Sequence, residues 1–304
     1  MLTSVAFRAP FYEVALVDVF SRGAFLWAEA VCWLLRRMGK PYVLVLRGGA
    51  LPDFLRVRPQ RGRGLFEMAA AVVAPSNYLK QEFTRFRSDL VLIPNAIDLG
   101  SCQYRTRGPV QPRLIWLRAF HRVYAPHKAL ETLALLKPRF PGATLLMVGG
   151  DKGDGSLVRT QRLAEDLKLS SSVTFTGAVE KRDVPRWLNQ GDIFLNTTTV
   201  DNTPVSVIEA LACGLCVVTT DPGGIRYLLE EGKTALLVPV SDAHAMAAAV
   251  ERLLLDPSLA ARLSGAGRAL VEPFDWGVVL PLWESLLLSA ARSIAPSLPQ
   301  EVAP

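Results

Sequence analysis

The sequence predicts an α/β fold with two parallel-sheet domains, and three observations support this. Short apolar segments typical of buried strands alternate with helical segments along most of the chain. The alternation forms two series, separated by a stretch that contains Gly108, Pro109 and Pro112. At 304 residues the chain is long enough for two domains of ordinary size. Strand–helix–strand alternation of this kind is typical of Rossmann-like domains, so we expect two of them.

The first series predicts a domain over residues 1–98. A helix is expected at 24–38, because Arg36, Arg37 and the Gly39-Lys40-Pro41 step are typical of a helix end. The expected strands are 14–19, 42–46, 71–74 and 90–93.

The second series predicts a domain over residues 113–275, with a linker at 99–112 before it. A closing helix is expected at 276–292, followed by a tail rich in Pro, Ser and Ala at 293–304. The expected strands are 113–117, 144–148, 173–176, 193–196, 216–219 and 236–238, and the expected helices are 129–139, 157–167, 184–189 and 243–255.

One segment of the second domain combines two acids with a helix start. Seven residues separate Asp201 from Glu209, and between them Thr203 is a good N-cap and Pro204 suits the first helical position. This places Asp201 at the open end of a helix and Glu209 about two turns inside it. The backbone N–H groups and the positive dipole end between the acids suit a phosphate or sugar-phosphate.

This segment resembles the signature of the retaining glycosyltransferases of family 4, which transfer a sugar from a nucleotide-sugar donor. Its two acids are followed by Ala-Leu-Ala-Cys213-Gly214 and by a Gly-Gly-Ile loop at 223–225. The first acid is Asp201 rather than the usual Glu, a shorter carboxylate. The segment 94–98, Pro-Asn-Ala-Ile-Asp, is similar to the one that ends the first domain in that family. The resemblance covers nearly all of residues 12–290 and implies the GT-B architecture; a plain α/β unit in which Glu209 caps or salt-bridges something is the alternative.

The resemblance also implies roles for single residues. Arg118 stands where the family's Arg grips the donor diphosphate, and a guanidinium suits paired phosphate oxygens. Lys128 is the expected equivalent of the family's partner Lys, with Arg122 as the competitor. The carboxylate of Asp201 would orient or stabilise the transferred sugar, and Glu209 would hydrogen-bond the ribose. A surface position is the alternative for both Arg118 and Lys128. Further donor contacts are expected from Thr176, Gly177, Thr203, Val205 and Ser206.

Two departures from the family concern the first domain, which is expected on the acceptor side. Family 4 chains open with about 70–90 further residues before the segment that begins here at Tyr12, judged from usual domain sizes. We therefore expect a shortened first domain with an exposed sheet edge. The Arg47-Gly48 step stands where many relatives have His-Gly, and an arginine holds anions but does not exchange a proton at neutral pH. Donor binding with poor turnover is the expectation for the chain alone.

The net charge of +6 is concentrated in the first half, since residues 1–110 contain 15 Lys/Arg and 8 Asp/Glu. A basic half can contact anionic lipid or a phosphate-bearing acceptor, and a solvated arginine-rich surface is the alternative. No nucleic-acid-reading module accompanies the charge, so nucleic acid is not an expected partner. No apolar run reaches the roughly 18–20 residues of a membrane span, and no signal-peptide pattern opens the sequence. We expect a cytoplasmic protein with peripheral contact to the inner membrane face.

The cysteines and histidines predict no metal site. Cys213-Gly-Leu-Cys216 has redox or zinc spacing, but a second pair and a nearby His are lacking, which favours buried structural thiols. A Walker loop, a Gly-x-Gly-x-x-Gly loop and an Asp-x-Asp motif are also lacking. We therefore expect a metal-independent reaction without a cofactor. The three histidines, at positions 121, 127 and 244, form no metal-binding spacing.

The leading hypothesis is a retaining, hexosyltransferase-type glycosyltransferase. It would move a sugar from a nucleotide-diphosphate-sugar donor to a glycan or lipid-linked acceptor, as in polysaccharide biosynthesis. A non-catalytic donor-binding subunit that needs a partner is one alternative. Another GT-B enzyme, such as a nucleotide-sugar epimerase, is the second, although the histidine and carboxylate set expected near its sugar is lacking.

Overall fold

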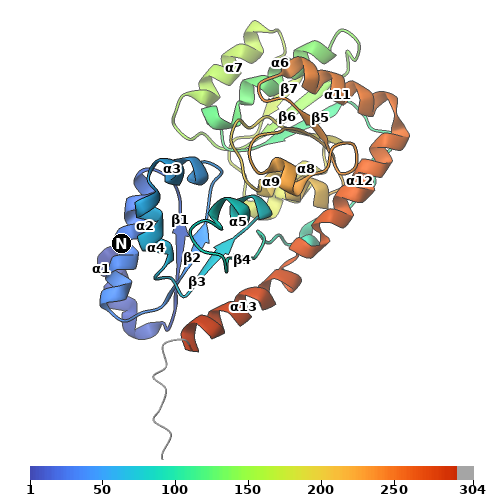
Figure 1. Ribbon diagram of the computed structural model, residues 1–304. Coiled ribbons are helices and arrows are strands. Elements are labelled where there is room, and N and C mark those ends of the chain that lie inside the picture. Colours follow the sequence, from blue (N-terminus) through green and yellow to red (C-terminus); the bar gives the residue numbers. More distant parts are fainter. Residues whose placement is uncertain (293–304) are drawn as a thin grey trace, which may run out of the picture. The chain divides into compact units, whose positions relative to one another are not determined.

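The computed structural model describes residues 1–292, which form two compact units. Unit 1 contains Met1–Pro94 and the chain from Gly277 on, and unit 2 contains Asn95–Trp276. Both sheets are parallel throughout, which confirms the predicted α/β class (Figure 1). The tail expected at 293–304 lies outside the described residues.

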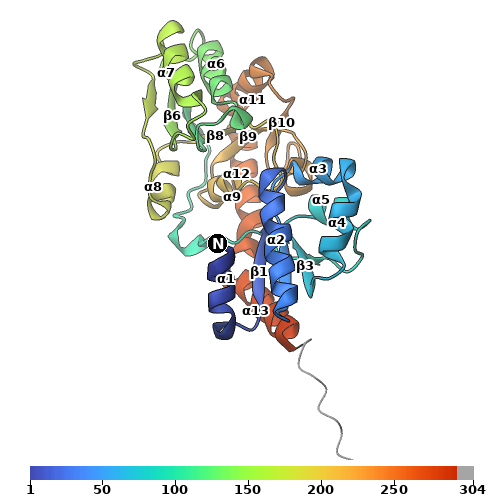
Figure 2. The same cartoon turned by 90° about the vertical axis from the view of Figure 1, so that its left-hand side faces the viewer.

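Unit 1 contains a four-stranded sheet in the order β1-β2-β3-β4. The central strands β2 and β3 are buried over their whole length, and α2 lies over β1 (Figure 2). Strand β1 lies at one edge of this sheet, and its Leu16 is 52% exposed. The strands are β1 (Ala15–Val19), β2 (Tyr42–Leu46), β3 (Ala71–Ala74) and β4 (Val91–Leu92). The helices are α1 (Leu2–Arg8), α2 (Gly23–Arg37), α3 (Leu51–Val57), α4 (Pro59–Phe66), α5 (Asn77–Phe83) and α13 (Trp276–Arg292), the last belonging to this unit from Gly277.

The four expected strands and the helix α2 of unit 1 are therefore present, within one or two residues of the predicted bounds. Helices α1, α3, α4 and α5 were not predicted. The sequence did contain a helix-start signal for two of them, since Pro52 and Pro59 occupy the first turns of α3 and α4.

Unit 2 contains a six-stranded sheet in the order β10-β9-β8-β5-β6-β7. Counted within the unit this is the order 6-5-4-1-2-3, the strand order of a Rossmann fold. The direction of strand addition reverses between β5 and β8, and ligands of such sheets bind outside the carboxyl ends of the strands at this reversal. The strands are β5 (Arg113–Leu117), β6 (Thr144–Val148), β7 (Val173–Phe175), β8 (Ile193–Asn196), β9 (Cys216–Thr220) and β10 (Leu236–Val238). The helices are α6 (Pro126–Leu136), α7 (Ser156–Asp166), α8 (Val184–Leu188), α9 (Val205–Ala212), α10 (Ile225–Leu228), α11 (Ala243–Leu255) and α12 (Pro257–Val271).

Helices cover both faces of the unit 2 sheet, so alternate strand residues enter two different cores. On β5, Leu114 and Trp116 pack with α6, α11 and α12, whereas Ile115 between them packs with α8 and α9. The same alternation separates Phe194 from its neighbours on β8. A sheet buried on both faces explains why its strands appear in the sequence as nearly continuous apolar runs.

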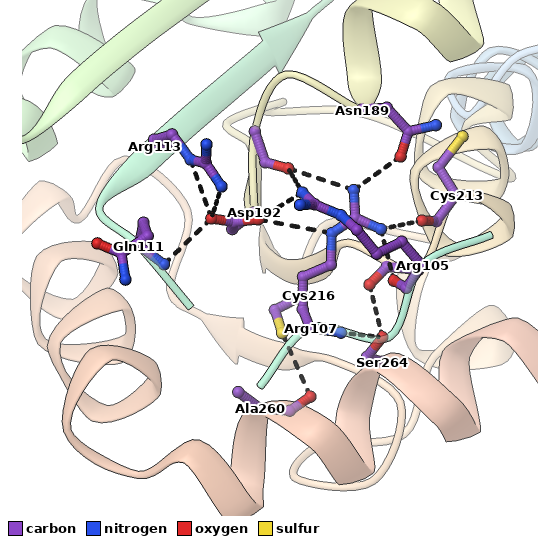
Figure 3. A network of polar contacts seen from close by, with 12 residues as sticks. Arg105, Arg107, Gln111, Arg113, Asn189, Asp192, Cys213, Cys216, Ala260 and Ser264 are labelled. Carbon is purple, nitrogen blue, oxygen red and sulfur yellow. Dashed lines mark hydrogen bonds and ion pairs between the residues drawn. The ribbon is translucent and has the colours of Figure 1, made fainter. Parts of the chain in front are cut away.

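Residues 99–112, expected as a linker, instead pack on unit 2; we call this segment the strap. Arg107 is its anchor: the side chain is 1% exposed and donates to the carbonyl oxygen of Cys213 and to Asn189 Oδ1, the latter at 2.9 Å. Asp192, just before β8, accepts hydrogen bonds from Arg105 at 2.8 Å and from Arg113 at 2.8 Å (Figure 3). This network lies where the strands of unit 2 begin, away from their carboxyl ends, and it attaches the strap to the fold.

Candidate functional site

The structure brings Arg118 and Asp201 together at the topological reversal of unit 2. Arg118 directly follows β5, and Asp201 lies in the loop that follows β8, the neighbouring strand. The Arg118 guanidinium donates to Asp201 Oδ2, and both side chains are largely buried, with exposures of 15% and 14%. Two residues predicted as donor ligands therefore meet where a Rossmann-type sheet binds its ligand.

Hydrogen bonds between the two loops hold this pair in place. The hydroxyl of Thr197 donates to the carbonyl oxygen of Tyr124 at 2.6 Å and accepts from the indole of Trp116 at 2.9 Å. The backbone amide of Thr199 donates to the carbonyl oxygen of Val123 at 2.8 Å. The loop after β5 and the loop after β8 are consequently one connected structure, and the ion pair spans it.

Two glycines allow the backbone around the pair to pack closely. Gly149 has φ +149°, and a Cβ there would lie 1.8 Å from the carbonyl oxygen of Arg118. A Cβ on Gly224 would lie 2.4 Å from the carbonyl oxygen of Asn202. The amide of Gly224 donates to the carbonyl oxygen of Asp201 at 3.1 Å. The backbone of Arg118 thus packs against Gly149, and the backbone of Asn202, next to Asp201, packs against Gly224; a Cβ at either glycine would clash.

Burial dominates the electrostatics of the pair. It raises the pKa of the Asp201 carboxyl above its ordinary value, and the neighbouring Arg118 only partly offsets this effect. The guanidinium of Arg118 also lies over the Tyr124 ring, 4.7 Å from its centroid. Its Nε is buried and has no hydrogen-bond partner among the described residues. A buried guanidinium with an unused donor is well suited to an additional anion.

The amino end of α9 faces the same loop. The helix begins at Val205 with Pro204 as its N-cap, one residue later than expected, so the prediction that Thr203 caps the helix is wrong. The buried hydroxyls of Thr203 and Ser206 have no hydrogen-bond partner within residues 1–292. The amides of Val205 and Ser206 precede the point where intrahelical hydrogen bonding starts. These hydroxyls and amides form a set of polar groups at a positive helix end.

Glu209 lies further along α9 and lines a hollow of about 320 Å³. Burial raises the pKa of its carboxyl, while Lys181 and Arg118 act in the opposite direction. The positive charge of Arg118 therefore influences both acids of the motif. The other residues that line this hollow are Ile97, Asp98, Ser101, Cys102, Lys181, Arg182 and Pro185.

The two candidates for a second phosphate-binding cation lie elsewhere in unit 2. Helix α6 begins at Pro126, three residues before the expected start, so Lys128 falls in its first turn and pairs with Glu131 at 2.7 Å. Lys128 lines a pocket together with Ser241 and His244, and neither Arg118 nor Asp201 lines that pocket. Arg122 lines a separate hollow of about 400 Å³. Among the described residues Asp201 pairs with Arg118, and neither Lys128 nor Arg122 shares one of these pockets with it.

Thr176 and Gly177 lie at the carboxyl end of β7, at the far edge of the sheet from β8. The carbonyl oxygen of Gly177 accepts from the amide of Gly149 at 3.0 Å and from the hydroxyl of Thr176 at 2.8 Å. This carbonyl is therefore used within the fold, and it links the β7 end to the glycine that supports Arg118.

On unit 1, Arg47 and Gly48 follow β2. Arg47 Nε donates to Asp18 Oδ1 at 2.9 Å, and Gly48 has φ +80°. Asp18 lies on β1, so the arginine connects the two strands at one edge of the sheet. The predicted acceptor-side role of both residues stays a prediction.

Two residues of the site were missed by the sequence analysis. Tyr124 supports the guanidinium of Arg118, and its signal was the aromatic residue inside the loop that follows β5. Lys181 lies in the hollow of Glu209 and comes from the segment after β7. Contacts of this kind bring together loops that are distant in sequence, so spacing alone does not reveal them.

The described part of the chain has neither a metal-binding cluster nor a membrane-spanning helix. Residues 1–292 contain no group of three or more His, Cys, Asp or Glu side chains arranged to hold a metal ion. No helix within the same residues combines the length and apolar character needed to cross a membrane.

The chain contains two parallel-sheet units, and the Rossmann-type unit has a basic–acidic pair at its strand reversal, which is compatible with the GT-B glycosyltransferases. Residues 109–270 match the model of the family Glycosyl transferases group 1, and the chain belongs to this family. It is similar to the phosphatidyl-myo-inositol mannosyltransferase of Mycobacterium tuberculosis, with 29% identity over 248 residues. That match covers 76% of this chain and 63% of the mannosyltransferase, so the chain spans less than two thirds of the relative.

Solved structures show the same fold. Sucrose-phosphate synthase from Thermosynechococcus elongatus superposes with a TM-score of 0.79 and 22% identity, over 95% of this chain and 76% of that one. Anabaena Alr3699/HepE in complex with UDP gives a TM-score of 0.78 and 19% identity, over 94% and 81% of the two chains. The predicted GT-B fold is thereby confirmed.

Proposed function

We propose that the chain is a retaining glycosyltransferase of family 4 that uses a nucleotide-diphosphate-sugar donor without a metal ion. The observation that supports this most strongly is the Arg118–Asp201 pair at the strand reversal of unit 2, beside the amino end of α9. The UDP in the Anabaena structure named above is consistent with such a donor. A shared fold would leave the choice of ligand open, so the proposal depends on the residues.

Each group in the site has a task in this proposal. A donor phosphate replaces the Asp201 carboxylate on Arg118, and it also accepts from the unused Nε and from the first amides of α9. As the bond to the sugar breaks, negative charge develops on the leaving diphosphate, and these preorganised donors stabilise it. The released Asp201 carboxylate orients and stabilises the transferred sugar, and Glu209 hydrogen-bonds the ribose.

Calorimetry with UDP, GDP and ADP in the presence of EDTA tests donor binding. We expect at least one of them to bind, and Arg118→Ala to weaken that binding by about 1.5–3 kcal/mol through loss of a charge-assisted contact. Arg139→Ala is the matched control, because this arginine is 56% exposed and pairs with Glu251 on the same unit. Equal affinities of the two variants would contradict the proposed site, and binding that appears only with magnesium would contradict metal independence.

The second cation is tested in the same experiment with Lys128→Ala. If Lys128 leaves Glu131 to bind the diphosphate, this variant loses affinity as Arg118→Ala does. If its affinity equals that of Arg139→Ala, Lys128 has no part in donor binding. Arg122→Ala tests the competitor in the same way.

The reaction class is tested by incubating the binding donor with candidate glycan and lipid-linked acceptors. A new glycosidic product whose anomeric configuration matches the donor supports a retaining hexosyltransferase. An epimerised nucleotide sugar without transfer supports an epimerase instead. Donor binding without either product supports a donor-binding subunit that needs a partner.

A peripheral contact with an anionic membrane face is a further part of the proposal. Helix α2 leaves Leu26, Trp27 and Trp33 more than half exposed, and the Arg37 guanidinium lies 5.2 Å from the Trp33 ring centroid. Exposed tryptophans beside basic residues are typical of helices that lie at a membrane interface. Flotation with phosphatidylglycerol vesicles is expected to carry the protein, and Trp33→Ala to reduce this. Equal flotation with phosphatidylcholine vesicles would contradict an electrostatic contact at the inner membrane face.

A further inference from the structure

Two cysteines of unit 2 lie against each other beside the hollow that Glu209 lines. Cys102 follows the short 3-10 turn Leu99–Ser101 in the strap, and Cys213 is the C-cap of α9. Both belong to the same apolar cluster, and the interaction between the two thiols shifts the pKa of each in opposite directions. The Cys102 thiol also donates to the carbonyl oxygen of Asp98 at 3.4 Å. The pair differs from the Cys213–Cys216 spacing in the sequence, because Cys216 lies on β9 and its thiol donates to the carbonyl oxygen of Ala260 at 3.4 Å.

Backbone contacts of the strap hold Cys102 close to the C-terminal end of α9, where Cys213 lies. The amide of Arg105 donates to the carbonyl oxygen of Cys213 at 3.3 Å, and the buried Arg107 donates to the same oxygen. A Cβ on Gly214 would lie 2.4 Å from the carbonyl oxygen of Arg105. The backbone around residue 105 is therefore held against the end of α9, and Cys102 is held a few residues away.

The two thiols have different surroundings. Cys213 is fully buried, whereas Cys102 is 6% exposed and lines the hollow of about 320 Å³ together with Glu209. The contact with Cys213 lowers the pKa of the Cys102 thiol. The same contact, followed by burial, raises the pKa of the Cys213 thiol. A small reagent in the hollow consequently meets the Cys102 sulfur before the fully buried Cys213 sulfur.

We propose that Cys102 and Cys213 are an oxidation site, and that hydrogen peroxide closes them to an intramolecular disulfide. The Cys102 thiolate attacks one peroxide oxygen, the O–O bond breaks, and the leaving hydroxide takes up a proton to form water. The product is a sulfenic acid on Cys102. The Cys213 sulfur then attacks the Cys102 sulfur, the S–O bond breaks, and hydroxide leaves with the Cys213 proton as a second water. One peroxide is reduced and two thiols are oxidised.

The disulfide would act on the candidate donor site through α9. Cys213 ends the helix one turn after Glu209, and Cys102 shares a hollow with that acid. A covalent bond draws the strap toward the helix end and narrows the space beside Glu209. Oxidation is therefore expected to weaken nucleoside diphosphate binding. This effect on binding rests on the proposed function, whereas formation of the disulfide does not depend on it.

The chemistry is tested on the full chain with hydrogen peroxide and peptide mapping under non-reducing conditions. We expect a linked peptide pair that contains Cys102 and Cys213, and a fall from four titratable thiols to two in the denatured protein. Cys102→Ala and Cys213→Ala should each abolish the linked pair, and Cys216→Ser should leave it intact. A link between Cys213 and Cys216, or an unchanged thiol count in the folded wild type at excess peroxide, would overturn the proposal.

The effect on binding is measured separately, by calorimetry with UDP, GDP and ADP before and after oxidation. The link to the donor site is supported if oxidation lowers the affinity of the wild type, if dithiothreitol reverses this loss, and if Cys102→Ala shows no such loss. Unchanged affinity in the disulfide form would contradict that link. A protein that forms the disulfide but binds no nucleotide in either state would contradict the proposed function and leave the oxidation site standing.

Discussion

Arg118 has two possible anionic partners in the proposed site, the Asp201 carboxylate and the donor phosphate. In the structure the Asp201 carboxylate pairs with the Arg118 guanidinium, and both side chains are largely buried. Free nucleoside diphosphate must therefore compete with an acid that is already in place. The affinity of the diphosphate and the rate of transfer should respond to Asp201 in opposite directions.

We predict that Asp201→Asn binds the nucleoside diphosphate more tightly while transfer activity falls. Removing the competing charge frees a charge-assisted contact of about 1.5–3 kcal/mol, which corresponds to roughly a tenfold or larger gain in affinity. Calorimetry and a transfer assay on the same preparation measure the two effects. Weaker binding by the variant would mean that Asp201 holds Arg118 in its binding position instead of competing for it.

The second acid of the motif makes stability depend on pH. Burial raises the folded-state pKa of Glu209 above its ordinary value of 4.5, so the folded protein holds this proton more tightly than the unfolded chain does. The stability that this proton provides is complete below pH 4.5 and is lost as the pH rises through the raised pKa.

We predict that Glu209→Gln is more stable than the wild type at neutral pH, because the variant carries no buried charge. The difference should shrink as the pH falls toward 4.5 and vanish below it. Thermal unfolding from pH 4 to pH 8 measures this. A variant that is less stable at neutral pH would show that Lys181 and Arg118 outweigh burial.

At the scale of the element, the loop after β6 supports the loop after β5. Gly149 rests against the backbone of Arg118, and its amide donates to Gly177 at 3.0 Å. Three strand ends are thereby linked, and the position of the arginine depends on a residue without a side chain.

We predict that Gly149→Ala destabilises the protein by about 2–4 kcal/mol, since it combines an unfavourable φ with a backbone clash. It should also weaken nucleotide binding, because Arg118 has to shift. Gly265→Ala in α12 is the control: a Cβ there meets nothing within 4 Å, and a stabilisation of up to about 1 kcal/mol is expected from helix propensity. Denaturant unfolding of both variants checks the sign, and similar stabilities would contradict the close contact at Gly149.

At the scale of the whole molecule, the strap decides where unit 2 begins. The first domain was expected to end at residue 98 and the second to start at 113, whereas the compact unit starts at Asn95. Ile97 forms a β-bridge with Asp275, and the buried Arg107 satisfies carbonyl oxygens of Cys213 and Gly191. Burial destabilises the charged form of the Arg107 guanidinium and lowers its pKa to about 10. A buried charge of this kind needs hydrogen-bond partners such as these carbonyl oxygens.

We predict that a fragment of residues 95–276 folds cooperatively and that a fragment of residues 113–276 does not. Loss of the strap removes Arg107 from its partners, and breaking a buried pair of this kind costs about 3–5 kcal/mol, much of the total stability of an ordinary domain. Circular dichroism and denaturant unfolding compare the two fragments. Within the longer one, Arg107→Ala should destabilise far more than Arg105→Ala, whose side chain is 49% exposed in the wild type; equal effects would show that the strap is dispensable.

The sequence by itself determined the α/β class and the ten strands, because apolar runs define buried strands. The motif around Asp201 and Glu209 gave the GT-B resemblance, and that resemblance assigned Arg118 and Asp201 to one donor site. Their ion pair was not predicted and is seen only in the structure. The buried state of Cys213 and Cys216 was also predicted and is confirmed.

Only the tertiary structure decided the N-cap at Pro204, the location of Lys128 beside Glu131, and the packing of the strap on unit 2. It also decided that Cys102 meets Cys213 and that Tyr124 lies under Arg118. Each of these depends on contacts between segments far apart in the chain, and such contacts leave no periodicity or spacing in a single sequence. Their energies are set by burial and by partners that exist only once the sheet has formed.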